Sequence, residues 1–187
     1  MPPHISGPVW LHGPIDGVPD LLQPVAHSLI EAAQDVRTLL ATVTPQQTWT
    51  RPYGAASLGF HVRHPTGSLD RLLTYARGEA LDEAQLATLA AEKTMDASAG
   101  GPAQLSADFD AAVDRALAQL RSTSPDALLE RREVGRARLP SNVLGLLVHA
   151  ADHTYRHVGQ AVTTARIVKA MGGDGSGQAT AREAGRD

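Results

Sequence analysis

The chain has 187 residues, no cysteine and a formal net charge of −3 at pH 7. The lack of cysteine excludes disulfide scaffolds, thiolate metal sites and cysteine nucleophiles, and the charge shows none of the basic excess that is typical of nucleic-acid binders. Aromatic residues make up 4% of the sequence and apolar residues 42%, which favours closely packed helices over strands.

Residues 1–20 are rich in proline and glycine, a pattern that predicts an extended lead segment. We expect Trp10 and Leu11 to pack this segment onto the body of the protein. The N-terminus shows no export signal, and no stretch reaches the roughly 18 apolar residues that a membrane helix requires. The sequence therefore predicts a cytoplasmic protein without a membrane segment.

The rest of the chain predicts an all-α protein, a four-helix bundle over residues 21–170. Apolar residues recur at spacings of three and four, the period of a helix. The expected helices are residues 21–43, 57–75, 82–93, 106–122 and 140–170, and residues 171–187 form a glycine-rich tail. Little of the sequence shows the alternation of a strand, and we expect no sheet larger than a hairpin.

The second long helix contains Pro65 and Gly67 near its middle. An interior proline removes one backbone hydrogen bond and clashes with the preceding turn. The sequence therefore predicts a kink or break within one turn of His64.

Residues 123–140 are irregular and charged, and four arginines fall within eight positions. They are Arg131, Arg132, Arg136 and Arg138. Such a cluster could bind an anion, although a solvated charged loop is the simpler interpretation.

The last helix carries the residues with the clearest chemistry. His149, His153 and His157 are spaced four apart and lie on one stripe of the helix. Two histidines at this spacing can bind one divalent metal, but the outer two are about 12 Å apart along the axis. The pair is therefore either His149 with His153 or His153 with His157.

A metal site on this helix needs a third ligand from another element. His61 and His64 lie three residues apart on the second long helix, so they point in similar directions. Three neutral histidines with an open fourth position are a common catalytic arrangement of zinc.

Two motifs resemble those of the DinB-like superfamily of four-helix bundles. Residues 153–160, His-Thr-Tyr-Arg-His-Val-Gly-Gln, are similar to its last-helix signature, in which the second of two histidines precedes a Gly-Gln pair. Residues 60–64, Phe-His-Val-Arg-His, followed by residues 70–75 and Gly78, are similar to its second helix. The resemblance covers roughly residues 8–168.

The resemblance implies one divalent metal ion, zinc, nickel or similar, held by His64, His153 and His157. It thus selects His157 over His149. His149 becomes a neighbour of the site, and Gln160, three residues after His157, is a candidate for orienting a ligand. A proline directly after His64 departs from the family pattern, and His61 is the substitute ligand if Pro65 turns His64 away.

The family includes thiol-dependent transferases and proteins described as metal-dependent hydrolases. The resemblance therefore implies a metal-dependent enzyme that acts on a small molecule, with a low-molecular-weight thiol as one candidate partner. The alternative is a non-catalytic metal-binding or structural protein of the stress or DNA-damage response. This alternative gains weight because the sequence shows no obvious carboxylate beside the histidines. Family members often pair, so we also expect a homodimer.

Overall fold

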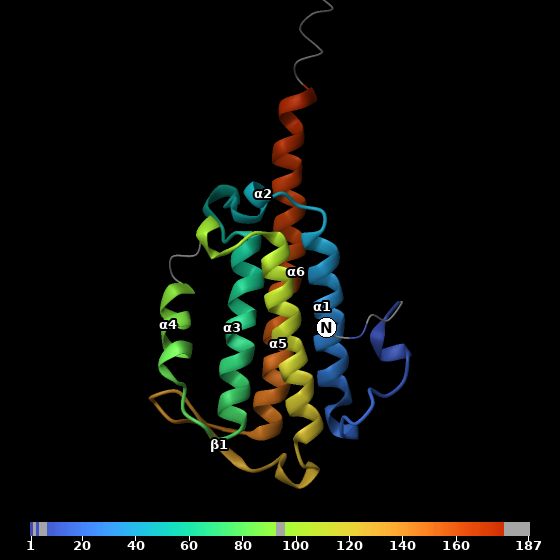
Figure 1. Ribbon diagram of the computed structural model, residues 1–187, viewed down its shortest axis with the longest axis vertical. Coiled ribbons are helices and arrows are strands. Elements are labelled where there is room, and N and C mark those ends of the chain that lie inside the picture. The colour runs from blue at the N-terminus through green and yellow to red at the C-terminus, as the bar shows by residue number, and fades with distance from the viewer. Residues whose placement is uncertain (2, 4–6, 93–95, 178–187) are drawn as a thin grey trace, which may run out of the picture.

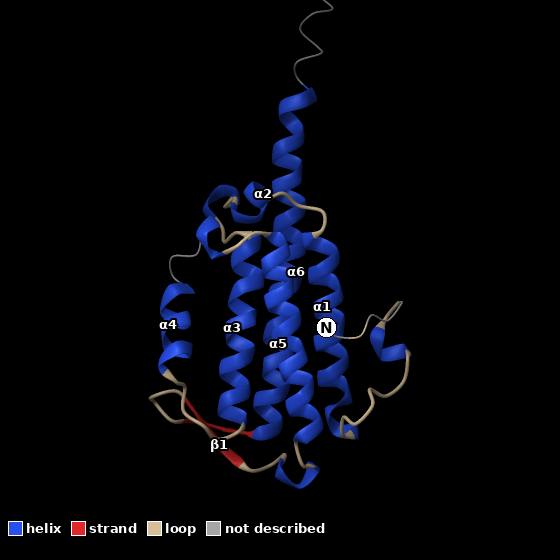
Figure 2. Ribbon diagram, in the orientation of Figure 1, coloured by secondary structure: helices blue, strands red, loops and turns tan. Residues whose placement is uncertain are grey.

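Four long helices run side by side in the computed structural model, which describes residues 1, 3, 7–92 and 96–177 (Figures 1 and 2). They are α1 (Gln23–Leu40), α3 (Leu58–Ala76), α5 (Pro102–Ser122) and α6 (Val143–Gly177). The predicted all-α four-helix bundle is confirmed.

Shorter elements connect the long helices. They are the single turns η1 (Val9–Leu11), η2 (Asp20–Leu22), η3 (Pro52–Gly54), η5 (Ala97–Ala99) and η6 (Pro125–Ala127), the short helices α2 (Pro45–Trp49) and α4 (Glu83–Ala91), and the strands β1 (Arg131–Val134) and β2 (Leu139–Asn142). The two strands form an antiparallel hairpin at the end of the bundle where α3 ends (Figure 2). This hairpin lies largely within residues 123–140, which the sequence predicted to be irregular.

The core lies between the four long helices and is built from aliphatic side chains and alanine. Phe109 is its largest fully buried side chain, and Leu29, Leu69 and Leu147 are among the other fully buried residues. Buried alanines, among them Ala33 on α1, let neighbouring helices approach closely. The apolar stripe of each helix thus specifies which face points inward.

The lead segment packs onto the bundle through residues other than those expected. Trp10 and Leu11 are 64% and 61% exposed, so that prediction is wrong. Val9 and Val18 are buried instead. The reason is local: Val9, Trp10 and Leu11 form a single 3-10 turn, in which consecutive side chains point in different directions, and only the first faces α1.

The sequence predicted a kink or a break near Pro65, and the break is wrong, because α3 is helical without interruption from Leu58 to Ala76. An interior proline costs about 3 kcal/mol, whereas each fully buried aliphatic side chain contributes about 1.5–3 kcal/mol. Val62, Leu69 and the Pro65 ring itself are buried on the inward face of α3. Packing on both sides of the proline therefore outweighs the lost hydrogen bond.

Two helix boundaries differ from the sequence-based ones by four residues or more. Pro102 begins α5 four residues earlier than expected, at the first helical position where a proline is tolerated. The last helix continues to Gly177, so residues 171–177 are helical and do not belong to a tail. The remainder of the predicted tail, residues 178–187, lies outside the described residues. Among the described residues, no helix combines the length and apolar character needed to cross a membrane.

Two helical glycines offer a matched test of this packing. A Cβ at Gly59 would lie 2.8 Å from the ring of Trp49, whereas a Cβ at Gly159 would meet no atom within 4 Å. We expect Gly59→Ala to lower the free energy of unfolding by about 1–3 kcal/mol because the indole must move. Gly159→Ala should raise it by about 0.5–1 kcal/mol through helix propensity. Urea unfolding of both variants measures the difference, and equal effects would contradict the close packing at Gly59.

Candidate metal centre

Three histidines from two helices come together in the middle of the bundle. His64 lies on α3, and His153 and His157 lie one turn apart on α6. One ring nitrogen from each lies within 4.8 Å of the others, and the ring centroids are 4.7–5.1 Å apart. The three are partly buried and could hold one metal ion.

Local hydrogen bonds mark where the two helices begin. The Ser57 side chain accepts a hydrogen bond from the Phe60 amide and starts α3. At the other helix, the Asn142 side chain accepts from the Gly145 amide at 2.7 Å. Both helices thus begin at capped positions, and their buried apolar residues orient the faces that carry the histidines.

His64 is oriented by a carboxylate. Its Nδ1 lies 2.7 Å from Oε2 of Glu92, so the neutral form of the ring donates its Nδ1 proton there and keeps a lone pair on Nε2. The other oxygen of Glu92 accepts from Arg71 at 2.7 Å, and both of these side chains are buried. A carboxylate behind a histidine in this way is the usual support of a metal ligand.

Gly67 makes room for this contact. A Cβ at Gly67 would lie 2.9 Å from both an Arg71 nitrogen and a Glu92 oxygen. The glycine in the middle of α3 therefore leaves space for the ion pair and marks no break in the helix.

Glu92 is ionised although its side chain is buried. Burial raises the pKa of this carboxyl group, but hydrogen bonds from His64 and Arg71 together with the positive charge of Arg71 outweigh that effect and leave the pKa below its usual value. Glu92 is therefore ionised at neutral pH and holds the proton of His64 on Nδ1.

His153 faces His64 across the site, with 3.4 Å between their Nε2 atoms. Burial, followed by the neighbouring His64 and His149, lowers the pKa of His153. Its Nδ1 is buried and has no hydrogen-bond partner among the described residues. His153 is thus neutral at physiological pH, with one nitrogen directed into the site.

His157 contacts the site and a fourth histidine. Its Nδ1 lies 3.1 Å from Nδ1 of His61, which leaves Nε2 of His157 free for an ion. Burial and the nearby His64 and His153 lower the pKa of His157 to about 4. The pKa of His61 is lowered too, by burial and by His64.

The remaining predicted residues lie around this group. His61 contacts His157 and supports it, and His64 is not turned away by Pro65. His149 is exposed, with its ring centroid 5.8 Å from that of His153. Gln160 is exposed on α6, so it does not face the bundle interior.

Glu92 is the residue that sequence reasoning missed. It follows α4, a short helix with no buried residue, and meets His64 across 28 positions of sequence. No motif marks it. Gly67 was the one available signal, because an interior glycine often marks a close approach of another group.

The sequence profile of the DinB superfamily matches residues 28–161. This chain belongs to the DinB superfamily. Solved structures agree with the fold: a conserved protein from Enterococcus faecalis has a TM-score of 0.63 at 21% identity, with 80% of this chain and 97% of that one covered. No curated protein matches the chain.

Two solved structures described as DinB proteins have a similar fold. A protein assigned to the family from Exiguobacterium sibiricum 255-15 has a TM-score of 0.63 at 18% identity, with 81% of this chain and 94% of that one covered. A DinB-like protein from Bacillus cereus ATCC 10987 has a TM-score of 0.56 at 13% identity, with 72% of this chain and 84% of that one covered. At these identities the likeness concerns the fold alone.

The lowered pKa of His157 predicts a pH-dependent stability of the metal-free protein. The unfolded chain protonates this residue near its ordinary pKa of 6.5, whereas the folded chain does so only near 4. The unfolded state therefore binds more protons between these values, and stability is lost as the pH falls from 6.5 toward 4. Urea unfolding at pH 7 and pH 5 measures this effect. The free energy of unfolding should fall less between these two pH values in His157→Gln than in the wild type. An equal loss in both proteins would contradict the shift.

Proposed function

We propose that this DinB protein binds one divalent metal ion through His64, His153 and His157 and is a metal-dependent enzyme acting on a small molecule. The observation that carries the proposal is the meeting of three imidazole nitrogens from two helices within 4.8 Å. Lone pairs on facing nitrogens repel one another unless a cation or a proton lies between them. The lowered pKa values of His153 and His157 disfavour the proton.

The side chains fit an ion, with one local cost. If Nε2 of His153 binds the ion, the ring proton moves to Nδ1, which is buried without a partner. An unsatisfied buried donor costs about 1–3 kcal/mol. Binding of zinc at a structural site contributes about 10 kcal/mol or more. The cost is therefore small beside the gain.

Three neutral ligands suit Lewis-acid chemistry. When bound, the ion keeps its double positive charge and lowers the pKa of a water or a thiol, or polarises a carbonyl group. The protein's own residues prepare the site: Glu92 keeps the His64 proton on Nδ1, and His61 contacts the second nitrogen of His157. His64 has 22% of its side chain exposed, so a small molecule can reach the site.

Glu92 does not act as a free base in this arrangement, because His64 and Arg71 occupy both of its oxygens. The ion itself must therefore activate the nucleophile, and both a thiol and a water molecule meet that requirement. Transfer to a thiol and hydrolysis by activated water are thus the two proposed reaction classes. The thiol substrate, the cytoplasmic location and the homodimer stay predictions.

Metal binding is tested on protein purified without a histidine tag. We expect elemental analysis to find about one divalent ion per chain, and His153→Ala to abolish binding because both possible pairs on α6 include this residue. His149→Ala is the matched control from the same helix and should retain the metal. If His149→Ala lost the metal and His157→Ala retained it, the ion would be bound by His149 and His153, one turn earlier on α6.

The contribution of Glu92 is tested without removing a ligand. Loss of a carboxylate behind a ligating histidine lowers metal affinity about 10–100-fold, and we expect this for Glu92→Gln in a competition titration with a chelator. Gly67→Ala should act in the same direction, because its methyl group displaces the Arg71–Glu92 pair while leaving every polar group in place. Unchanged affinity in both variants would show that His64 needs no such support.

Catalysis is tested by comparing the metal-loaded and the metal-stripped protein. Each is assayed with low-molecular-weight thiols and small electrophiles, and the expected result is turnover that requires the metal and is absent in His153→Ala. A tightly bound ion with no turnover in either reaction class would favour the non-catalytic alternative.

A further inference from the structure

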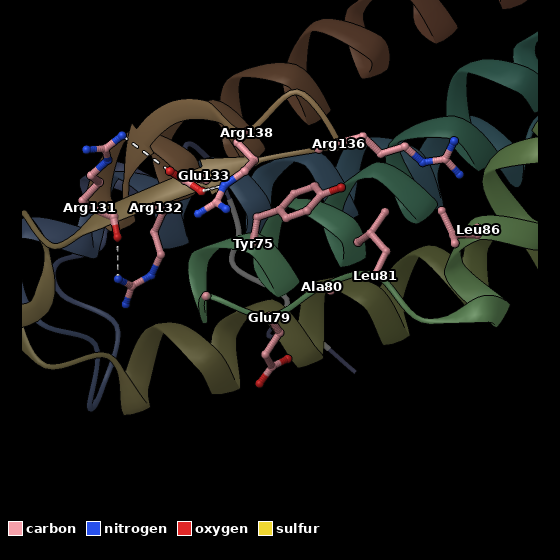
Figure 3. A pocket seen from close by; sticks show the side chains of 12 residues that line it. Tyr75, Glu79, Ala80, Leu81, Leu86, Arg131, Arg132, Glu133, Arg136 and Arg138 are labelled. Carbon is pink, nitrogen blue, oxygen red and sulfur yellow. Dashed lines mark hydrogen bonds and ion pairs between the residues drawn. The ribbon is translucent and has the colours of Figure 1, made fainter.

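The four arginines of the hairpin segment do not come together as a site. Arg131, Arg132, Arg136 and Arg138 line a pocket of about 730 Å³ beside the connection from α3 to α4. In Figure 3 the side chains of Arg136 and Arg138 extend in opposite directions, with Tyr75 between them. A small anion therefore cannot contact both guanidinium groups, and the arrangement supports the solvated charged loop.

Phe60 lies among the histidines of the candidate metal centre. It precedes His64 by four residues on α3, a spacing that places two side chains on the same face of a helix. Its side chain is partly buried. Every ring–ring contact between residues that the structure describes belongs to this cluster. Phe60 is its only ring without a nitrogen, and it contacts His61, His64 and His157.

The contact between Phe60 and His64 is a parallel stack. The two ring planes are inclined by 5° and the ring centroids are 5.4 Å apart, which is the offset arrangement that aromatic pairs prefer. Phe60 also meets His157 on α6, with the centroids 6.2 Å apart and the planes inclined by 60°. One phenyl ring thus contacts a candidate ligand from each of the two helices that form the site.

The ring plane of His64 depends on its neighbours, because rotation of a histidine ring about its Cβ–Cγ bond has only a broad preference of its own. Glu92 holds one edge of the ring through the hydrogen bond from Nδ1. Glu92 follows α4, a helix with no buried residue, so this contact depends on a weakly attached segment. Phe60 covers a face of the same ring from the helix that carries His64, and its contact does not depend on α4.

We propose that Phe60 is a positioning residue of the metal centre, whose ring holds the His64 imidazole in the plane in which Nε2 faces His153 across the site. The inference rests on the proposed binding of a divalent ion by His64, His153 and His157. A ligand that is ordered before the ion arrives raises the affinity, because no binding energy is spent on ordering it. Without such order, the apparent dissociation constant rises by the reciprocal of the fraction of molecules in which His64 is correctly turned.

The orientation of His64 is measured on the metal-free full chain by NMR of the histidine ring protons. Protons that lie over the face of a phenyl ring are shifted upfield, so the stack has a signature of its own. Phe60→Leu keeps an apolar side chain and removes the ring. We expect it to abolish the upfield shift of the His64 protons and to broaden their resonances as the imidazole samples other orientations. Phe60→Tyr keeps the ring and should leave both features unchanged.

Metal affinity is measured by competition between the protein and a chelator for Zn²⁺. A typical aromatic pair changes an equilibrium constant about 2- to 12-fold, so Phe60→Leu should weaken Zn²⁺ binding by about this factor, and Phe60→Tyr should not. Phe109→Leu is the matched control, because Phe109 is the only other phenylalanine and lies buried in the core. It should lower the free energy of unfolding in urea and leave the His64 resonances and the Zn²⁺ affinity unchanged.

The positioning role is refuted if Phe60→Leu, folded by circular dichroism, shows the His64 resonances of the wild type. It is also refuted if Phe60→Leu binds Zn²⁺ as tightly as the wild type or no more weakly than Phe109→Leu does. In the second case Phe60 would act only through the stability of the bundle. A wild-type protein that binds no metal would instead refute the proposed function, and the metal-free resonances would still decide whether Phe60 orients His64.

Discussion

The packing of α3 against α6 is the interaction on which the candidate metal centre depends. His64 is on one of these helices and His153 and His157 are on the other, so the site exists only while the two helices keep their register. Buried aliphatic residues on both, such as Val62 and Val158, hold that register. Because interior packing tolerates little displacement, a shift that would misplace the histidines also opens the core. The geometry of the site is thus protected by the stability of the bundle.

Pro65 shows how this packing overrides a local preference. Its missing amide argues for a break in the helix, and a break there would separate His64 from α6. The inward face of α3 is buried on both sides of the proline, and the helix continues. The presence of glycine at the neighbouring position 67 is explained by a different constraint, because a side chain there would overlap the Arg71–Glu92 pair. One segment of sequence that looked like a single anomaly therefore contains two independent features.

The bundle and its histidines could be predicted from sequence because both follow from periodicity within single helices. A spacing of three and four marks the buried faces, and a spacing of four places His153 and His157 together. Glu92 could not be predicted in the same way. Its role depends on where α4 packs, and α4 has no buried face from which a pattern could be read. The hairpin was missed for a related reason, because its strands are short, contain no buried residue and show no clear alternation.

The position of α4 is therefore set by polar contacts at its two ends. Near its start, Gln85 donates to Asp70 and Thr74 on α3, and just after its end Glu92 contacts His64 and Arg71. A segment with few buried apolar contacts opens at a lower free-energy cost than the bundle does. Leu86 on the same helix lines a pocket next to the β1–β2 hairpin. Loss of the Glu92 contacts would thus loosen α4 first, and both the support of His64 and one wall of the pocket would change together.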